Sequence, residues 1–355
     1  MKQPTRAQRI AGSIFGSAYG DAAGRPTEFI GKISTSESAI RRFDARLYED
    51  LHGYKVTDDT MMMLAVGRAV LAQPRGGRFA ALTWPGRMAA ALRKEYIAWS
   101  QMDQAGRAPG GTCMQAIHGL AGQPRAPWQQ HTVMRSKGCG ANMRVQPIAF
   151  LSIPDDEAAG LAQLSAAMTH GHPTALAAAD LTVRAIRLLA SGAPLDESLI
   201  DELVRYARSQ RTIYRRRWLG NLFNQRSEFS GRHPRHWIAA GWDQMINALE
   251  NVRFGLAAWG GVGDPCEFTG DGWVAEEALA TALLVSITFR DAPMEALTRA
   301  ALTRGDSDSL ACITGALLGA KHGVRVWRDA WRDRIEFSAE LDQLGAGLVQ
   351  LGSGR

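Results

Sequence analysis

The sequence predicts an all-α protein that folds as one domain, and three observations favour this class. Segments rich in Ala and Leu, with their apolar residues at helical spacing, recur along the whole chain. Alternating patterns of β-branched residues are scarce, and no GxGxxG turn follows a strand, which argues against a doubly wound nucleotide-binding fold. The 355 residues contain no repeat of fixed period and no Ser/Gly-rich linker. We therefore expect function on the loops between helices.

Ten segments have the helical spacing, and polar residues such as Asp155 and Asp196 mark helix starts. The predicted helices are residues 10–21, 61–72, 86–102, 155–170, 174–191, 196–209, 236–251, 274–289, 292–303 and 310–322. The helix at 61–72 is apolar on nearly every side, so we expect it to be central and buried. Four segments rich in Gly and Pro are expected to be loops: residues 24–54, 109–112, 135–147 and 260–272.

Composition favours a packed protein of a reducing compartment. Hydrophobic residues make up 46% of the chain and charged residues 21%, which allows a large core. The four cysteines, Cys113, Cys139, Cys266 and Cys312, are far apart and form no CxxC, so we expect free thiols. The N-terminal apolar run holds Gly, Ser, Tyr and Asp and makes a poor signal peptide. Because no run of about 18 apolar residues occurs, no membrane span is expected, and we predict a cytoplasmic protein.

The net charge of +6 is concentrated in one stretch, "RYARSQRTIYRRRW". It carries six arginines between Arg205 and Arg217. A nucleic-acid-binding face is not expected, because no recognition motif or aromatic interleaving accompanies the run. Such runs usually form a solvated helix face or a surface for a partner protein.

The first acidic cluster is Thr57-Asp58-Asp59-Thr60, directly before the helix at 61–72. One interpretation is an N-cap, because Thr and Asp are favoured there and offset the helix dipole. A cap needs only one side chain, however, and side-chain oxygens are the ligands that Mg²⁺, Mn²⁺ and Ca²⁺ prefer. Both interpretations stay open on this cluster alone.

The second cluster lies in "TRGDSDSLACITGALLGA", where Asp306 and Asp308 alternate with serines before the helix at 310–322. In an extended or turning segment, two acids at this spacing can converge on one cation, whereas on a helix they would point apart. An acidic cap is equally compatible with the pattern. Behind the acids, Ala311, Gly315 and Gly319 form a stripe of small residues that allows another helix to approach closely.

Two further acids lie in "GSAYGDAAGRPTEF". Asp21 ends or interrupts the first predicted helix and is best explained as a buried acid bonded to backbone N–H groups. Glu28 follows Pro26 in a predicted loop and is free to face a site.

The acids also provide a charge argument. Asp58, Asp59, Asp306 and Asp308, with Glu28 as a fifth, would be too costly to bury together without positive charge. Two helix N-termini offset only about half a charge each. Two divalent cations would resolve the excess if the clusters meet in space.

Six motifs together resemble the ADP-ribosylglycohydrolases in their order along the chain. They are "GSAYGDAAGRPTEF", "VTDDTMMMLAV", "KGCGANMRVQPIAF", Thr169-His170, "GDGWVAEEALATAL" and "RGDSDSLACITGALLGA". The resemblance runs from about residue 10 to 323 and leaves 324–355 as a C-terminal extension of a single domain, 1–355. It implies a compact multi-helix orthogonal bundle, with a binuclear Mg²⁺ or Mn²⁺ centre in a cleft formed by inter-helix loops.

The resemblance also implies which residues form the site. The metal ligands would be Thr57, Asp58, Asp59, Asp306, Asp308 and Ser309, with Glu28 and Asp306 as catalytic carboxylates. The family usually has Thr in place of Ser309, and Ser lacks the methyl group that stiffens the rotamer. The substrate would contact the Gly-rich loop, which is "KGCGANMR" at residues 137–144, together with two further loops and a helix end. These residues are Gly138, Gly140, Ala141, Asn142, Met143, Arg144, Gly110, Thr112, His170, Gly270 and Trp273. Ala141 stands where the family more often has Gly. From the residues alone, the glycine pair could be a simple turn, His170 a structural histidine and Trp273 a core residue.

The activity implied is removal of mono-ADP-ribose from modified protein side chains. Metals would bind the ribose 2″ and 3″ hydroxyls, and Asp306 or Glu28 would accept a proton from water or assist the leaving group. The pattern looks closest to the bacterial arginine-directed branch, with serine-linked or polymeric ADP-ribose as the alternative. A family member of this kind can also act as an immunity protein against an ADP-ribosylating toxin, for which residues 205–217 offer a contact surface. The alternative from another class is a non-catalytic, crystallin-like protein, which the full set of acids argues against.

Overall fold

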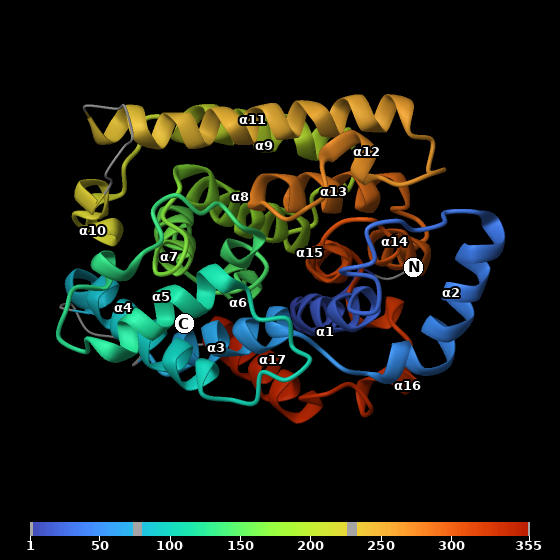
Figure 1. Cartoon of the computed structure of the whole chain (residues 1–355), viewed down its shortest axis with the longest axis horizontal. Coiled ribbons are helices and arrows are strands. Elements are labelled where there is room, and N and C mark those ends of the chain that lie inside the picture. The colour runs from blue at the N-terminus through green and yellow to red at the C-terminus, as the bar shows by residue number, and fades with distance from the viewer. Residues whose placement is uncertain (1–2, 74–79, 226–232, 354–355) are drawn as a thin grey trace.

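The computed structural model describes residues 3–73, 80–225 and 233–353, and it is built of helices (Figure 1). Within these ranges no β-strand occurs, and the all-α prediction is confirmed. The α-helices are α1 (Arg6–Gly24), α2 (Glu37–Asp50), α3 (Asp58–Leu71), α4 (Ala80–Ser100), α5 (Gly111–Gly122), α6 (Gln146–Ala149), α7 (Asp155–Ala167), α8 (Pro173–Ala190), α9 (Glu197–Gln210), α10 (Arg216–Leu219), α11 (Pro234–Ala258), α12 (Cys266–Thr269), α13 (Ala275–Thr288), α14 (Pro293–Ala301), α15 (Ser307–His322), α16 (Asp329–Arg332) and α17 (Ser338–Ser353).

Each predicted helix corresponds to a helix of the structure, but the predicted loop at 24–54 is wrong over most of its length. It contains α2, which begins after the N-cap Ser36 and packs Phe43 and Leu47 inward. Gly and Ser around this segment, and the charged residues within it, mask a short amphipathic spacing. The helices α5 and α17 were likewise not predicted, and α12 lies inside the predicted loop 260–272.

The helices α1 and α15 lie against each other along their whole length, and glycines make this possible. A Cβ atom built on Gly16 would lie 2.3 Å from the carbonyl oxygen of Gly315, and one on Gly20 would lie 1.9 Å from that of Ala311. Gly12 and Gly319 meet in the same way at the other end. The small-residue stripe predicted on α15 is thus a contact with α1. The pairing is antiparallel, so the last turn of α1 meets the first turn of α15.

The helices α3, α8, α13, α14 and α17 pack around this pair. The long helix α11 crosses one face of the bundle, at the top of Figure 1, and packs on α8, α9 and α13. The helix α3 is buried on almost every side, as its sequence predicts. At the opposite side, α17 packs on α1 and α3, and Trp327 donates a hydrogen bond of 2.8 Å to the carbonyl of Gly12. The C-terminal extension is therefore part of the packing around α1.

The structure bears on two predictions from composition, one about the cysteines and one about membrane-spanning helices. All four cysteines are free thiols. Among the helices in the described ranges, none combines the length and the apolar character needed to cross a bilayer.

Candidate active site

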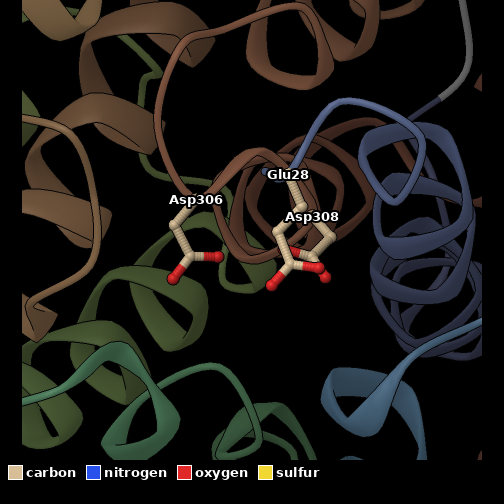
Figure 2. Close-up of side chains that lie close together, drawn as sticks. All are labelled: Glu28, Asp306 and Asp308. Carbon is tan, nitrogen blue, oxygen red and sulfur yellow. The ribbon is translucent and has the colours of Figure 1, made fainter. Parts of the chain in front are cut away.

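Three carboxylates from two distant parts of the sequence meet where α1 ends and α15 begins. Oxygen atoms of Glu28, Asp306 and Asp308 all lie within 4.8 Å of one another, and the three side chains are buried (Figure 2). Glu28 comes from the loop after α1, and the glycine-lined contact of α1 with α15 brings this loop to the aspartates. Thr27 fixes the loop, because its hydroxyl lies 2.9 Å from Ser307 Oγ. The sequence-predicted pairing of Glu28 with the second cluster is therefore present.

The two aspartates converge because only one of them belongs to the helix. Asp306 is the N-cap residue of α15, with a non-helical ψ of 69°, whereas Asp308 lies in the first turn. The turn is held from behind, since the Asp306 N–H donates to the carbonyl of Asp271 at 2.8 Å. Gly305 is required there, because a Cβ atom would lie 1.9 Å from the same carbonyl. The "GDSDS" stretch thus supplies a carboxylate pair at the start of α15, whereas the side chain of the N-cap residue Asp306 makes no capping hydrogen bond to the helix.

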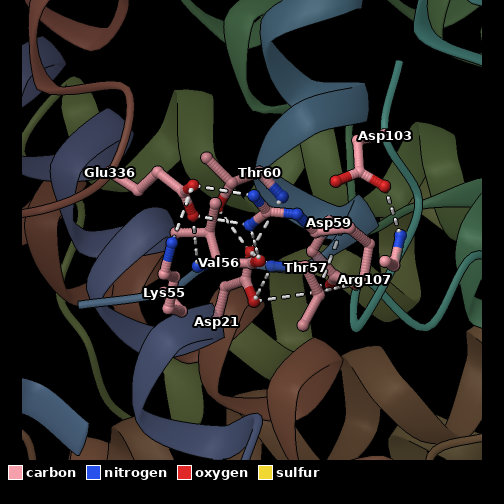
Figure 3. A network of polar contacts seen from close by, with 10 residues as sticks. Asp21, Lys55, Val56, Thr57, Asp59, Thr60, Asp103, Arg107 and Glu336 are labelled. Carbon is pink, nitrogen blue, oxygen red and sulfur yellow. Dashed lines mark hydrogen bonds and ion pairs between the residues drawn. The ribbon is translucent and has the colours of Figure 1, made fainter. Parts of the chain in front are cut away.

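The first cluster is organised by Asp21, a buried residue of α1. Its carboxylate accepts hydrogen bonds from the backbone N–H groups of Thr57 and Thr60, at 2.9 and 3.0 Å, and from both hydroxyls, at 2.8 and 2.5 Å (Figure 3). Thr57 is also the N-cap of α3. The interpretation of Asp21 as a buried acid bonded to backbone is confirmed.

Asp58 and Asp59 are left to face the cavity. Asp58 accepts a hydrogen bond of 3.2 Å from the N–H of Gly110, which ties the loop before α5 to α3. Asp59 is buried, and its Oδ1 has no hydrogen-bond partner among the described residues. Such an atom is costly to bury unless something absent from the protein chain, such as a cation, binds it.

A second network supports the start of α3 from the other side. Arg107 pairs with Glu336 through two contacts of 2.5 and 2.7 Å and donates to the carbonyl of Val56 at 2.7 Å. Glu336 in turn accepts the N–H of Val56, at 3.2 Å (Figure 3). The C-terminal segment thereby helps to fix the residue that precedes Thr57.

The acids open into a cavity of about 350 Å³. Most of the sequence-predicted site residues line it: Glu28, Asp58, Asp59, Gly110, Thr112, Gly138, Gly140, Met143, His170, Trp273, Asp306, Asp308 and Ser309. Those that do not line it are Thr57, Ala141, Asn142, Arg144 and Gly270.

Some of these five residues support the cavity wall from behind. Asn142 donates to the carbonyl of Ala275 at 3.1 Å. Arg144 is fully buried, stacks on the ring of Tyr96 and donates to Thr169 Oγ1 at 2.7 Å. Their roles in binding substrate stay predictions.

His170 presents its ring to the Gly-rich loop. Its Nδ1 lies 2.8 Å from Thr169 Oγ1, and a Cβ atom on Gly140 would lie 3.0 Å from its Cε1. Burial, reinforced by the nearby guanidinium of Arg144, lowers the pKa of His170 well below its usual value. The imidazole is therefore neutral at physiological pH and contributes no positive charge to the acid cluster.

The crowding of buried carboxyl groups in this cluster favours the binding of a cation. Burial first, and the neighbouring Asp308 and Asp306 next, raise the pKa of Glu28 to about 10. Burial also raises the pKa values of Asp58, Asp59 and Asp306 well above normal. Burial, followed by the charge of Asp308, raises the pKa of Asp21 to about 7. Carboxylate oxygens without a positively charged partner are suitable ligands for divalent cations such as Mg²⁺ or Mn²⁺. Asp59 Oδ1, which has no hydrogen-bond partner among the described residues, is one of these oxygens.

Among the cavity-lining residues that were not predicted from the sequence, Cys139 and Phe29 make specific contacts at the site. The thiol of Cys139 donates a hydrogen bond of 2.7 Å to Asp306 Oδ2. Phe29, next to Glu28, stacks on Trp273 at the cavity. Both stand inside motifs quoted above, but nothing in the sequence indicates that the Gly-rich loop contacts the start of α15, or that Phe29 meets Trp273.

The arginine run at 205–217 lies apart from this cavity, on α9, α10 and the segment between them. Most of its charges have partners: Arg205 pairs with Glu202, Arg211 with Asp243, Arg215 with Asp156 and Arg217 with Glu157. The run is thus largely neutralised within the chain. Its contact with a partner protein stays a prediction.

Comparisons with known proteins all point to one family. The sequence pattern of the ADP-ribosylglycohydrolase family matches residues 2–355. "ADP-ribosylhydrolase ARH3" of Danio rerio is 25% identical over 366 residues, which cover 97% of this chain and 90% of that protein. "ADP-ribosyl-[dinitrogen reductase] glycohydrolase" of Rhodospirillum rubrum is 30% identical over 200 residues, 54% of this chain and 61% of that protein. A solved chain described as "ADP-ribosylglycohydrolase-related protein complex" has the same fold, with a TM-score of 0.65, 21% identity and 98% coverage of both chains.

Proposed function

Because the chain belongs to the ADP-ribosylglycohydrolase family and is thus a glycosidic-bond hydrolase, we propose that it removes mono-ADP-ribose from arginine side chains of proteins. The observation that carries the proposal is the convergence of Glu28, Asp306 and Asp308 in a cavity that Asp58 and Asp59 also line. The motifs resemble the arginine-directed bacterial branch, which favours arginine over serine as the acceptor.

The reaction breaks the bond between ribose C1″ and a guanidinium nitrogen, adds the hydroxyl of water to C1″ and returns a proton to the nitrogen. We assign the two proton transfers to Asp306 and Glu28. Asp306 takes the proton from water, and Glu28 gives one to the departing nitrogen. Oxygen atoms of the two groups lie within 4.8 Å, so one water between them can carry the proton from Asp306 back to Glu28 between turnovers.

Two divalent cations, Mg²⁺ or Mn²⁺, would be held by Thr57, Asp58, Asp59, Asp306, Asp308 and Ser309. When bound, they supply positive charge and Lewis-acid polarisation at the ribose hydroxyls. The hydroxyl of Thr57 donates a hydrogen bond to Asp21, so a lone pair of the Thr57 oxygen remains available to a cation. The Cys139 thiol holds Asp306 from the side of the Gly-rich loop.

The direct test is release of ADP-ribose from an arginine-modified protein with Mg²⁺ or Mn²⁺ present, with a serine-modified peptide assayed alongside. We expect arginine-linked hydrolysis, lost in EDTA and reduced at least about 100-fold in Asp306→Ala. Asp243→Asn, which removes a surface ion pair with Arg211, is the matched control and should keep full activity. Full activity in EDTA or in Asp306→Ala would refute the cation-dependent site.

We further propose a cytoplasmic location, which suits four free thiols, and a role as an immunity protein against an ADP-ribosylating toxin. The toxin contact would be made by the arginine run at 205–217. Charge reversal at Arg208 and Arg216, followed by a pull-down with the candidate toxin, tests it. Undiminished capture would exclude this surface.

A further inference from the structure

Two exposed aromatic rings lie together at the rim of the active-site cavity. The rings of Phe29 and Trp273 are stacked, with centroids 5.8 Å apart and planes inclined by 22°. Phe29 is 72% exposed and Trp273 42% exposed, and both line the cavity. Core packing does not require aromatic side chains in such exposed positions, and exposed apolar surface beside a cavity commonly marks a binding site.

The backbones that carry the rings are fixed, so the rings are presented in a defined place. The hydroxyl of Thr27 lies 2.5 Å from the carbonyl of Ala301, which holds the chain two residues before Phe29. On the other side, the carbonyl of Trp273 accepts the N–H of Cys139 at 3.2 Å. The ring pair therefore bridges the loop after α1 and the loop before α13, directly beside Glu28.

The chemistry around the rings favours a planar cation. Five carboxyl groups line the cavity, and among the described residues that line it there is no arginine or lysine. Aromatic faces attract guanidinium groups through cation–π and stacking contacts, and a carboxylate nearby strengthens the attraction. Within the described ranges, no arginine or lysine lies over either ring.

The position of the rings determines which part of a bound substrate they would contact. Phe29 adjoins Glu28, whose carboxylate lies within 4.8 Å of those of Asp306 and Asp308. The groups that must lie at this end are the ribose and its leaving group. The diphosphate and adenine are expected farther away, along the Gly-rich loop and His170.

We propose that Phe29 and Trp273 form the recognition surface for the guanidinium of ADP-ribosylated arginine and thereby select arginine-linked over hydroxyl-linked substrates. The inference rests on the proposed function, since it assigns the leaving-group side of the same site. A serine leaving group has neither a planar face nor a positive charge, so it gains little from the rings.

The experiment compares Phe29→Leu and Trp273→Leu with wild type on arginine-linked and serine-linked ADP-ribosyl peptides. Leucine keeps apolar bulk and removes the aromatic face. We expect the ratio of kcat/KM values, arginine over serine, to fall about 3- to 30-fold, mainly through KM, while the Kd for free ADP-ribose stays within about 2-fold. Phe29→Tyr should retain the ratio. Phe254→Leu, which alters an exposed ring in tilted contact with Phe268 and outside the lining of the cavity, is the matched control.

Argininamide and citrullinamide, its uncharged counterpart, serve as inhibitors that need no turnover of arginine-linked substrate. We expect argininamide to inhibit at least about 3-fold more strongly in wild type and the difference to vanish in both leucine variants. An unchanged arginine-to-serine ratio, or equal inhibition by the two amides in wild type, would overturn the inference. A parallel loss of ADP-ribose affinity would overturn it in favour of a nucleotide platform. If wild type cleaves only serine-linked substrate while argininamide still binds selectively, the proposed function fails and the guanidinium site stands.

Discussion

The hydroxyl of Thr57 donates a hydrogen bond of 2.8 Å to Oδ1 of Asp21, so the start of α3 is held by an acid from α1. The same carboxylate binds Thr60 and two backbone N–H groups. Because Asp21 provides the negative charge that a helix N-terminus favours, Asp58 and Asp59 are not needed as caps. One helix therefore both frees the first pair of acids and, through its glycines, positions Glu28 against the second pair.

The Asp21→Asn variant should be strongly destabilised. An amide oxygen can replace one acceptor, but the NH₂ group would face the N–H donors of Thr57 and Thr60 and leave buried groups unpaired. We expect a loss of about 2–4 kcal/mol in the free energy of unfolding, measured by urea denaturation. Asp243→Asn is the control and should change stability by less than about 0.5 kcal/mol. Wild-type stability in Asp21→Asn would show that the carboxylate does not organise the cluster.

The α1–α15 contact leaves no room for a side chain, so Gly20→Ala and Gly315→Ala should each destabilise the protein. The added methyl group would lie 1.9 or 2.0 Å from a backbone carbonyl oxygen, and the helices must move apart. We expect a loss of about 1–3 kcal/mol or more, with reduced activity because Glu28 shifts from Asp308. Gly86→Ala, on α4 with open space around its Cβ position, should be neutral or stabilising. Thermal melting of the three variants decides the matter.

The fold class and the acids of the site could be predicted because each is encoded locally. The helical spacing of apolar residues predicts α3 and α15, and the acids lie in short runs at the starts of these helices. The small-residue stripe of α15 predicted a close helix contact without naming its partner. By contrast, α2 was missed because its apolar residues Phe43 and Leu47 are sparse among charges and flanked by Gly and Ser.

Relationships between distant residues were out of reach for a different reason. The burial of Arg144 depends on packing against Tyr96 from α4. The bond from Cys139 to Asp306 and the stacking of Phe29 on Trp273 each join segments more than a hundred residues apart. Spacing along the chain carries no information on such pairs, because they are created by how the loops are folded together.

The hydrogen bond from Cys139 to Asp306 should be a positioning contact that serine can replace and alanine cannot. In Cys139→Ala the carboxylate loses its donor and can rotate, which should lower kcat about 5- to 10-fold. In Cys139→Ser a hydroxyl donor remains, and kcat should stay within about 3-fold of wild type. The divalent-cation concentration for half-maximal activity should rise in the alanine variant only. Equal behaviour of the two variants would mean that the contact has no part in holding Asp306.

Stability in the absence of cations should fall as the pH rises. The pKa values of Glu28 and Asp21 are raised in the folded protein, to about 10 and about 7, above the values near 4 of an unfolded chain. Their contribution to folding is therefore complete below about pH 4 and is lost as the pH rises through those values. Added Mg²⁺ competes with the protons, so its stabilising effect should grow with pH.

Melting temperatures at pH 6, 7.5 and 9, each with EDTA or with Mg²⁺, test this expectation. We expect the increase in Tm on adding Mg²⁺ to be smallest at pH 6 and largest at pH 9. In an Asp306→Asn/Asp308→Asn variant the increase should be absent at every pH, because the second pair of carboxylates is neutral. A Mg²⁺ effect of equal size in that variant would place the binding elsewhere on the protein. An effect that is largest at pH 6 would contradict the competition between protons and cations at this cluster.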